Sequence, residues 1–278
     1  MGIKAIALDI DGTLTNDNKV ITERTREALL AAQGEGVKLI LSSGRPIQGL
    51  RALAAELSLD SNDGLLVAFN GAHVVDAQTD EVLYDQPLPA SVLRELIVHL
   101  RDFDVIPWVT EGDHLCLQRG CRHEIIYRGA PFDAVDYECR ICDLGWTEVD
   151  DLREVCTRPQ DKLLVASEPE YLQEHWREMY EPFKDSLSGM FTADFYYEFM
   201  APGISKGNAL AGALSKLGID ASEVIAFGDA ENDISMLSWA GTGVAMGNAT
   251  AAVKAIADYV TLSNNDDGIA VALAEFLG

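Results

Sequence analysis

The chain has 278 residues, of which 48% are hydrophobic, which is enough for a sizeable core and typical of a globular chain of about two domains. Acidic residues outnumber basic ones 45 to 21, giving a formal charge of −24. A surface this negative repels phosphate backbones and anionic lipid, so nucleic acid and membrane surfaces are not expected partners. A small anionic substrate would need local positive charge from a metal, lysine or arginine.

The N-terminal segment and the cysteines predict a cytoplasmic protein. The segment is apolar only briefly before Asp9 and lacks the long apolar run of a signal peptide. Five cysteines, an odd number, favour reduced thiols. Cys139 and Cys142 have CxxC spacing, but no second ligand pair accompanies them, so we expect packed or surface thiols rather than a zinc site.

Strands and helices are expected to alternate in the first third of the chain. Short apolar runs that end in polar turns predict buried strands at 3–8, 37–41 and 65–69. Thr22 suits the N-cap of a helix over 22–33, and Pro46 suits the first turn of a helix that ends near Leu57. This alternation is typical of a parallel α/β sheet.

The middle of the chain has a different pattern, in which short turns join successive strands and favour antiparallel sheet. The elements expected there are helices 90–101, 121–128 and 169–180, a strand pair over 105–118, and strands 161–166, 186–192 and 195–200. After Pro202 and Gly203 the alternation resumes. The elements expected there are helices 205–217, 231–238, 249–256 and 268–276 and strands 223–228, 242–245 and 259–260.

These patterns predict one α/β domain, residues 1–84 and 202–278, interrupted by an inserted α+β domain over residues 85–201.

Two carboxylates follow the first predicted strand, in the sequence Asp9-Ile-Asp11-Gly-Thr-Leu14. In an open parallel sheet, ligands gather at the carboxyl ends of the strands. One aspartate in such a place can attack phosphorus as a nucleophile, and the second can transfer the proton of the leaving oxygen. A DxDG segment taken alone is more often a turn in which aspartate caps backbone groups.

A second acidic group, Gly228 to Asp233, follows another apolar strand. Mg²⁺ prefers oxygen ligands, so Asp229 is a candidate ligand together with Asp9 and the backbone carbonyl of Asp11. Asn232 is a candidate for binding phosphate, and Asp233 for ligating or orienting the metal. Helix capping explains one such acid, but less well a whole cluster at a second strand end.

Two further segments predict anion binding. Ser43, Gly44 and Arg45 follow the second strand and precede a helix, where a hydroxyl and backbone N–H groups attract anions. Lys206 begins a helix, where a cation opposes the helix dipole, so an anionic partner such as phosphate or Asp9 is expected. Each segment alone is more often a cap or a solvated surface.

Taken together, these motifs resemble the haloacid dehalogenase superfamily and, within it, the Cof-type sugar-phosphatase-like family. The order is DxDGTL, a hydroxyl residue before Gly-Arg-Pro, a lysine, and GDxxND. The hydroxyl residue is Ser43, where many relatives have threonine. Further segments that resemble the family are Asn70–Ala72, Val244–Ala249 and Asn264–Gly268.

The resemblance implies a Rossmann-like core with a parallel sheet, an inserted α+β cap with an antiparallel sheet, and Mg²⁺-dependent hydrolysis of a small phosphate monoester such as a sugar phosphate. Asp9 would be the nucleophile, Asp11 the general acid/base, and Ser43 and Lys206 the phosphate clamp. The implied phosphate contacts are Ser43, Gly44, Arg45, Asn70, Lys206 and Asn232, and the implied metal ligands are Asp9, Asp11, Asp229 and Asp233.

Two alternatives stay open at this point: a phosphosugar mutase of the same superfamily, and a catalytically idle ligand-binding module on the same fold. The physiological substrate and the oligomeric state are not readable from the residues.

Overall fold

The computed structural model describes residues 2–277. The chain divides into two compact units, Met1–Asp85 together with Ser205–Gly278, and Gln86–Ile204. The predicted domain borders, 84/85 and 201/202, lie one and three residues before these divisions. That the second unit serves as a cap over the first stays a prediction.

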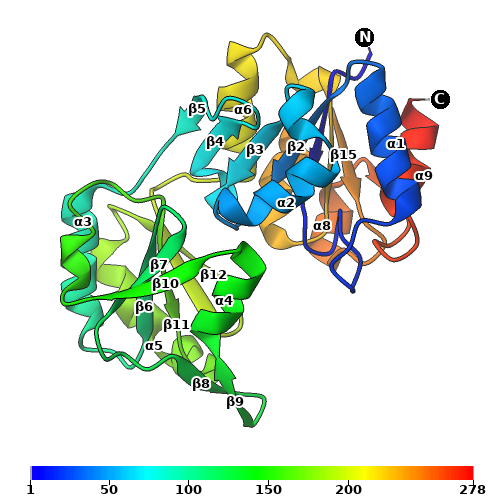
Figure 1. The fold of residues 1–278 in the computed structure, drawn as a ribbon. Helices are drawn as coiled ribbons and strands as arrows, with labels where there is room; N and C mark the ends of the chain where they lie inside the picture. The colour runs from blue at the N-terminus through cyan, green and yellow to red at the C-terminus, as the bar shows by residue number, and fades with distance from the viewer. Residues whose placement is uncertain (1, 278) are drawn as a thin grey trace. The chain divides into compact units, whose positions relative to one another are not determined.

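The first unit contains an eight-stranded sheet in the order β16-β15-β14-β1-β2-β3-β4-β5 (Figure 1). Neighbouring strands from β16 to β3 are parallel, whereas β4 and β5 add an antiparallel edge that the sequence analysis did not predict. The strands are β1 Ala5–Leu8, β2 Lys38–Ser42, β3 Leu65–Ala68, β4 His73–Asp76, β5 Val82–Asp85, β14 Val224–Gly228, β15 Thr242–Ala245 and β16 Tyr259–Val260.

Helices cover both faces of this sheet, which is why its central strands are continuous apolar runs. Side chains from α6, α7 and α8 form one core cluster with the sheet, while α1 and α9 pack side by side on the other face, near α2 (Figure 1). The helices are α1 Glu23–Gly34, α2 Gln48–Glu56, α6 Lys206–Lys216, α7 Ile234–Trp239, α8 Ala251–Ile256 and α9 Gly268–Phe276. The short 3₁₀ turns are η1 Leu59–Ser61, η2 Phe69–Gly71, η5 Ala221–Glu223 and η6 Glu231–Asp233.

The second unit contains a six-stranded sheet in the order β10-β7-β6-β11-β13-β12 and a separate hairpin, β8-β9. Among the described residues all pairs in it are antiparallel except β10 with β7. The strands are β6 Ile106–Glu111, β7 His114–Gln118, β8 Glu124–Tyr127, β9 Ala130–Asp133, β10 Gly145–Val149, β11 Lys162–Ala166, β12 Ser188–Ala193 and β13 Tyr196–Met200. The helical elements are α3 Ala90–Leu100, α4 Ala134–Cys142, α5 Pro169–Tyr180, η3 Leu152–Glu154 and η4 Glu181–Phe183. The faces of the sheet build two core clusters, one with α3 and α5 and the other with α4.

The helix predicted over 121–128 is wrong. The segment forms β8 of a hairpin, and its turn places Arg128 and Gly129 at φ values of 52° and 80°. Two successive left-handed residues make the tight turn that joins twisted antiparallel strands. Tertiary packing selects the strand, because Ile125 is buried while Ile126 is exposed.

The CxxC cysteines lie on α4, which the sequence analysis did not predict. Asp133 caps this helix by accepting a hydrogen bond from the N–H of Asp136 at 2.8 Å. Cys139 and Cys142 are buried, as expected for packed thiols, and all five cysteines are free.

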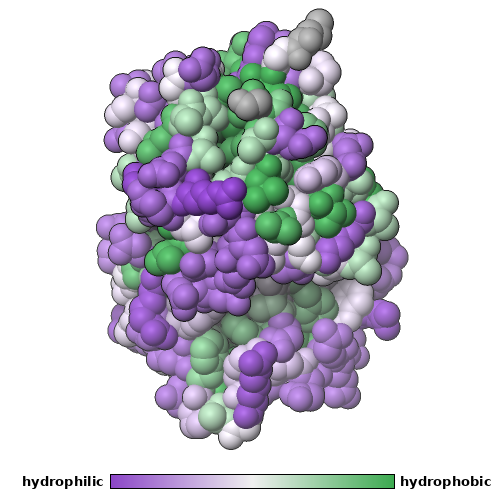
Figure 2. Space-filling model, turned by 90° about the vertical axis from the view of Figure 1, so that its right-hand side faces the viewer, coloured by the Kyte–Doolittle hydropathy of each residue, from purple (hydrophilic) through white to green (hydrophobic). Residues whose placement is uncertain are grey.

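Hydrophilic side chains are abundant on the face drawn in Figure 2, with hydrophobic ones interspersed among them. None of the helices within residues 2–277 combines the length and the apolar character that a membrane crossing requires.

Candidate active site

Four neighbouring parallel strands of the first unit carry the predicted site residues at their carboxyl ends. In sheet order these strands are β14, β1, β2 and β3. Asp229, Asp9 and Ser43 follow the first three strands directly, and Asn70 lies two residues beyond the last. The sheet therefore gathers at one edge residues that are up to 220 positions apart in the sequence (229 − 9).

Three carboxylates and one lysine form the buried centre of this edge. Ligand atoms of Asp9, Asp229 and Asp233 lie within 4.8 Å of one another. Lys206 Nζ lies 2.6 Å from Oδ1 of Asp9 and 2.6 Å from Oδ1 of Asp233. The side chains of Lys206 and Asp233 are fully buried, and that of Asp9 is 9% exposed. The expected contact between Lys206 and Asp9 is thus present.

The charges of this centre are unbalanced. Burial raises the pKa of Asp9 to about 8; neighbouring Asp233 adds to the shift, and Lys206 opposes it. Burial also raises the pKa of Asp229 to about 6, against the hydrogen bond from Thr13. Burial lowers the pKa of Lys206, but Asp233 and Asp9 outweigh it and raise the value overall. One ammonium group is therefore too little positive charge for three carboxylates, and the oxygen donors suit a hard divalent cation.

Backbone groups and Thr13 fix the orientation of these acids. Oδ2 of Asp233 accepts hydrogen bonds from the N–H groups of Asp229 at 2.9 Å and Ala230 at 3.0 Å. Thr13 donates its hydroxyl to Oδ1 of Asp229 at 2.8 Å. Gly12 has a φ of 87°, and a Cβ there would lie 2.4 Å from Oδ2 of Asp229. Glycine is needed at this position for both reasons.

The carboxylate of Asp11 is held apart from the group of three. Arg45 binds it through Nη2, 2.8 Å from each oxygen, and through Nε at 3.0 Å. Lys19 Nζ lies 2.7 Å from Oδ1. Burial favours a higher pKa for Asp11, but Arg45 and Lys19 outweigh it and lower the value. The side chain of Asp11 is 40% exposed, and the two cations favour its ionised form.

Four of the residues predicted to bind phosphate, Ser43, Arg45, Asn70 and Asn232, are connected by hydrogen bonds. Asn232 Nδ2 donates to Oδ1 of Asn70 at 3.0 Å, and the N–H of Asn70 donates to the carbonyl of Ser43 at 2.9 Å. Oγ of Ser43 accepts the N–H of Arg45 at 3.3 Å. A Cβ on Gly44 would lie 3.1 Å from Nδ2 of Asn70, so a larger residue would press on this group.

Sequence reasoning missed the contacts of three residues: Thr13, Lys19 and Asn248. Thr13 lies within the DxDGTL motif, and Asn248 lies within the Val244–Ala249 segment, so the family resemblance could have pointed to both residues. Asn248 Nδ2 donates to the carbonyl of Gly12 at 2.8 Å. No pattern in the sequence pointed to Lys19, because its contact with Asp11 depends on the loop that carries it.

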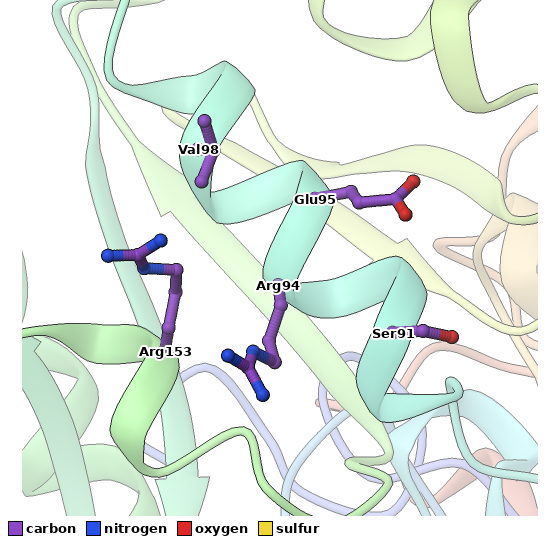
Figure 3. A pocket seen from close by; sticks show the side chains of 5 residues that line it. All are labelled: Ser91, Arg94, Glu95, Val98 and Arg153. Atoms are coloured by element: carbon purple, nitrogen blue, oxygen red, sulfur yellow. The ribbon is translucent and has the colours of Figure 1, made fainter.

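A groove on the second unit does not share this chemistry. It has a volume of about 490 Å³ and is lined by Ser91, Arg94, Glu95 and Val98 of α3 and by Arg153. Arg94 extends on the side of α3 that faces Arg153, whereas Ser91 and Glu95 extend to the other side (Figure 3). None of these residues belongs to the carboxylate or phosphate-binding groups.

The fold and the carboxylate-lined strand ends define a doubly wound α/β protein with an acidic site at one edge of its sheet, and comparison with known proteins identifies its class. The chain resembles the crystal structure of a haloacid dehalogenase-like hydrolase from Bacteroides thetaiotaomicron, with a TM-score of 0.89 and 32% identity over 98% of this chain and 99% of the other. It also resembles the sugar phosphatase BT4131, with a TM-score of 0.79 and 26% identity over 98% of each chain.

The model of the haloacid dehalogenase-like hydrolase family matches residues 6–273, and the chain belongs to that family. Among sequence relatives, the 5-amino-6-(5-phospho-D-ribitylamino)uracil phosphatase YcsE of Bacillus subtilis (strain 168) is 31% identical over 99% of this chain and 96% of its own length. The predicted family, fold class and enzyme class, a phosphoric monoester hydrolase, are confirmed.

Proposed function

We propose that this chain is a Mg²⁺-dependent phosphatase that hydrolyses a small phosphate monoester through an aspartyl-phosphate on Asp9. One observation carries the proposal. Asp9 lies at a strand end with Oδ1 bound to the buried ammonium of Lys206, while Oδ2 accepts no hydrogen bond from any described residue. One oxygen is thus fixed and the other is available for attack on phosphorus.

Asp9 and Asp229 would hold the metal together with the backbone carbonyl of Asp11. Both oxygens of Asp233 already accept hydrogen bonds, so this residue would mainly orient Lys206 and the turn at Asp229. A bound Mg²⁺ would supply the missing positive charge and neutralise the phosphate oxygens.

Asp9 Oδ2 would attack phosphorus and form an acyl phosphate, while the bond from phosphorus to the leaving oxygen breaks. Ser43, Lys206 and Asn232 would hold the other phosphate oxygens, since positioning and electrostatics dominate phosphoryl transfer. Asp11 would protonate the leaving oxygen, and then take a proton from the water that attacks the acyl phosphate. The ionised form, which Arg45 and Lys19 favour, is the one that accepts the proton of water. To act as an acid it must bind a proton and give up part of its contact with Arg45.

A sugar phosphate or similar metabolite is the proposed substrate class, supported by relatives whose names specify a sugar phosphatase and a phosphoribitylamino-uracil phosphatase. We further propose that the second unit acts as a mobile cap and selects the leaving group. A cytoplasmic location, in keeping with the free cysteines, stays part of the proposal.

The phosphosugar mutase would use the same Asp9 and Asp11, and product analysis separates the two. Free phosphate supports hydrolysis, and an isomeric sugar phosphate supports the mutase. The idle binding module is disfavoured because such a module needs no nucleophile with a free oxygen.

Replacement of the nucleophile tests the proposal. We expect Asp9→Asn to abolish phosphate release from a panel of phosphate esters in the presence of Mg²⁺ while the fold is retained by circular dichroism. Because the amide oxygen of asparagine is a poor nucleophile, a loss of at least about 10³-fold is expected. Substantial turnover by the folded variant would contradict the assignment, and an inactive unaltered chain would revive the binding module.

A further inference from the structure

We propose that Lys19 is a positioning residue for Asp11, presented by a loop that the asparagines of the C-terminal third hold in place. This inference rests on the proposed function, because it concerns the acid/base group of that reaction. Lys19 forms a salt bridge that no motif predicts. Its Nζ lies 2.7 Å from Oδ1 of Asp11, the oxygen that Arg45 also contacts.

The loop that carries Lys19 is closed by its own hydrogen bonds. Lys19 has a left-handed φ of 60°, and its N–H donates to the carbonyl of Asn16 at 2.8 Å. The side-chain oxygen of Asn16 accepts the N–H groups of Asn18 at 3.0 Å and Val20 at 3.3 Å. A lysine held in a sparsely populated backbone conformation requires such support, and this turn directs its side chain back to Asp11.

Asparagines of two distant segments fasten the same loop to the rest of the unit. Asn264 Nδ2 donates to the carbonyl of Thr15 at 3.0 Å, and Oδ1 of Asn265 accepts the N–H of Asp17 at 3.1 Å. Oδ1 of Asn248 accepts the N–H of Asn264 at 3.0 Å, while its Nδ2 donates to the carbonyl of Gly12. The residues on both sides of Asp11 are therefore tied to one another through these asparagines.

Lys19 and Arg45 differ in whether they would also contact the phosphate of the substrate. Arg45, 17% exposed, is a proposed phosphate contact and would be drawn from Asp11 toward a bound ester. Lys19, 62% exposed, lies on the other loop and would remain as the cation on the Asp11 carboxyl. An exposed ion pair contributes little to folding stability, so its removal should change the rate rather than the fold.

The test compares two esters that differ in their need for an acid. p-Nitrophenolate leaves without a proton, whereas the alkoxide of an alkyl phosphate such as glycerol 2-phosphate needs one. We expect Lys19→Met to lower the single-turnover rate of alcohol release from the alkyl ester about tenfold, a part of the usual contribution of proton transfer. The single-turnover release of p-nitrophenolate, which precedes the step in which Asp11 accepts the proton of water, should change less than about twofold. Lys19→Arg should restore most of the loss. In an Asp11→Asn background, Lys19→Met should have no further effect.

The control is Lys184→Met, which removes an exposed, ion-paired lysine of the second unit and should leave both rates and the melting temperature unchanged. Equal losses on both esters would overturn the proposal in favour of a structural role. A raised KM with unchanged kcat would overturn it in favour of a direct substrate contact, and full activity would overturn it outright. If the unaltered chain released phosphate from neither ester, the proposed function itself would fail, and this proposal with it.

Discussion

Each of the two units buries a lysine against carboxylates, but in different surroundings. In the first unit, Lys206 begins α6 and contacts Asp9 and Asp233 at 2.6 Å each. In the second, Lys162 lies on β11 and contacts Glu198 of β13, also at 2.6 Å. Burial lowers the pKa of Lys162, but the carboxylates of Glu198 and Glu138 outweigh it and raise the value overall. Distance and burial therefore do not tell the two pairs apart.

The neighbours of each pair show the difference. Glu198 is directly opposite Leu164 in the sheet, which in turn is paired with Trp108, and both belong to an apolar cluster beneath α4. The carboxylates around Lys206 lie at strand ends beside backbone N–H donors and a hydroxyl. A buried ion pair inside a sheet is thus a matter of stability, whereas one at the carboxyl edge of parallel strands is available for chemistry.

The largest expected effect is on kcat, which should fall when Lys206 is replaced but not when Lys162 is replaced. Lys206→Met should lower phosphatase kcat by about 10³-fold, because it removes both the cation that orients Asp9 and a phosphate contact. Lys162→Met should retain kcat within about twofold, when rates are normalised to the folded fraction at 15 °C or another temperature well below its melting transition. Steady-state kinetics with the same ester test both. A comparable loss of kcat in the two variants would show that Lys162 is needed for catalysis as much as Lys206.

The next effect is on stability, and here the two lysines should behave alike. Either Lys→Met change leaves a buried carboxylate without its cation and should lower the free energy of unfolding by about 3–5 kcal/mol. The double variant Lys162→Met with Glu198→Gln should recover part of that loss, because it removes the charge of Glu198, while the charge of buried Glu138 stays. Urea unfolding followed by circular dichroism measures all three. A fully stable Lys162→Met single variant would show that the pair is not needed for folding.

The last effect is a dependence of stability on pH, which arises from two carboxylates of the first unit. Asp9 and Asp229 have pKa values of about 8 and about 6 in the folded chain, above the ordinary value of 3.8. The folded state therefore binds more protons than the unfolded state, so in EDTA their contribution to stability falls as pH rises from about 4 to about 8. Mg²⁺ at about 100 times its Kd should add about 2.7 kcal/mol at the upper end of this range.

Unfolding midpoints at pH 5 and pH 8, with EDTA or with Mg²⁺, measure this dependence. Asp229→Asn is the matched variant: its response to Mg²⁺ should be weaker, while that of Glu198→Gln should equal the response of the unaltered chain. A stability that rises over this pH range in EDTA would contradict the raised pKa values.

Local sequence patterns predicted much of the first unit and less of the second. Apolar runs of four or five residues gave the strands β1, β2, β3 and β14 because both faces of a parallel sheet are buried. The hairpin β8-β9 and helix α4 were not predicted, since their residues are only partly apolar and their packing partners are far away in sequence.

The sequence by itself determined which residues stand at the strand ends. A short apolar run predicts a buried strand, and motif residues such as Asp9 to Leu14 follow directly after that run. From the helix dipole the sequence also suggested an anionic partner for Lys206, although a lysine in that place is, taken alone, more often a solvated surface residue. Only the tertiary structure decided that Asp11 faces Arg45 and Lys19 while Asp9 faces Lys206. Side-chain direction at a turn depends on loops and cations from other parts of the chain, which local propensity does not encode.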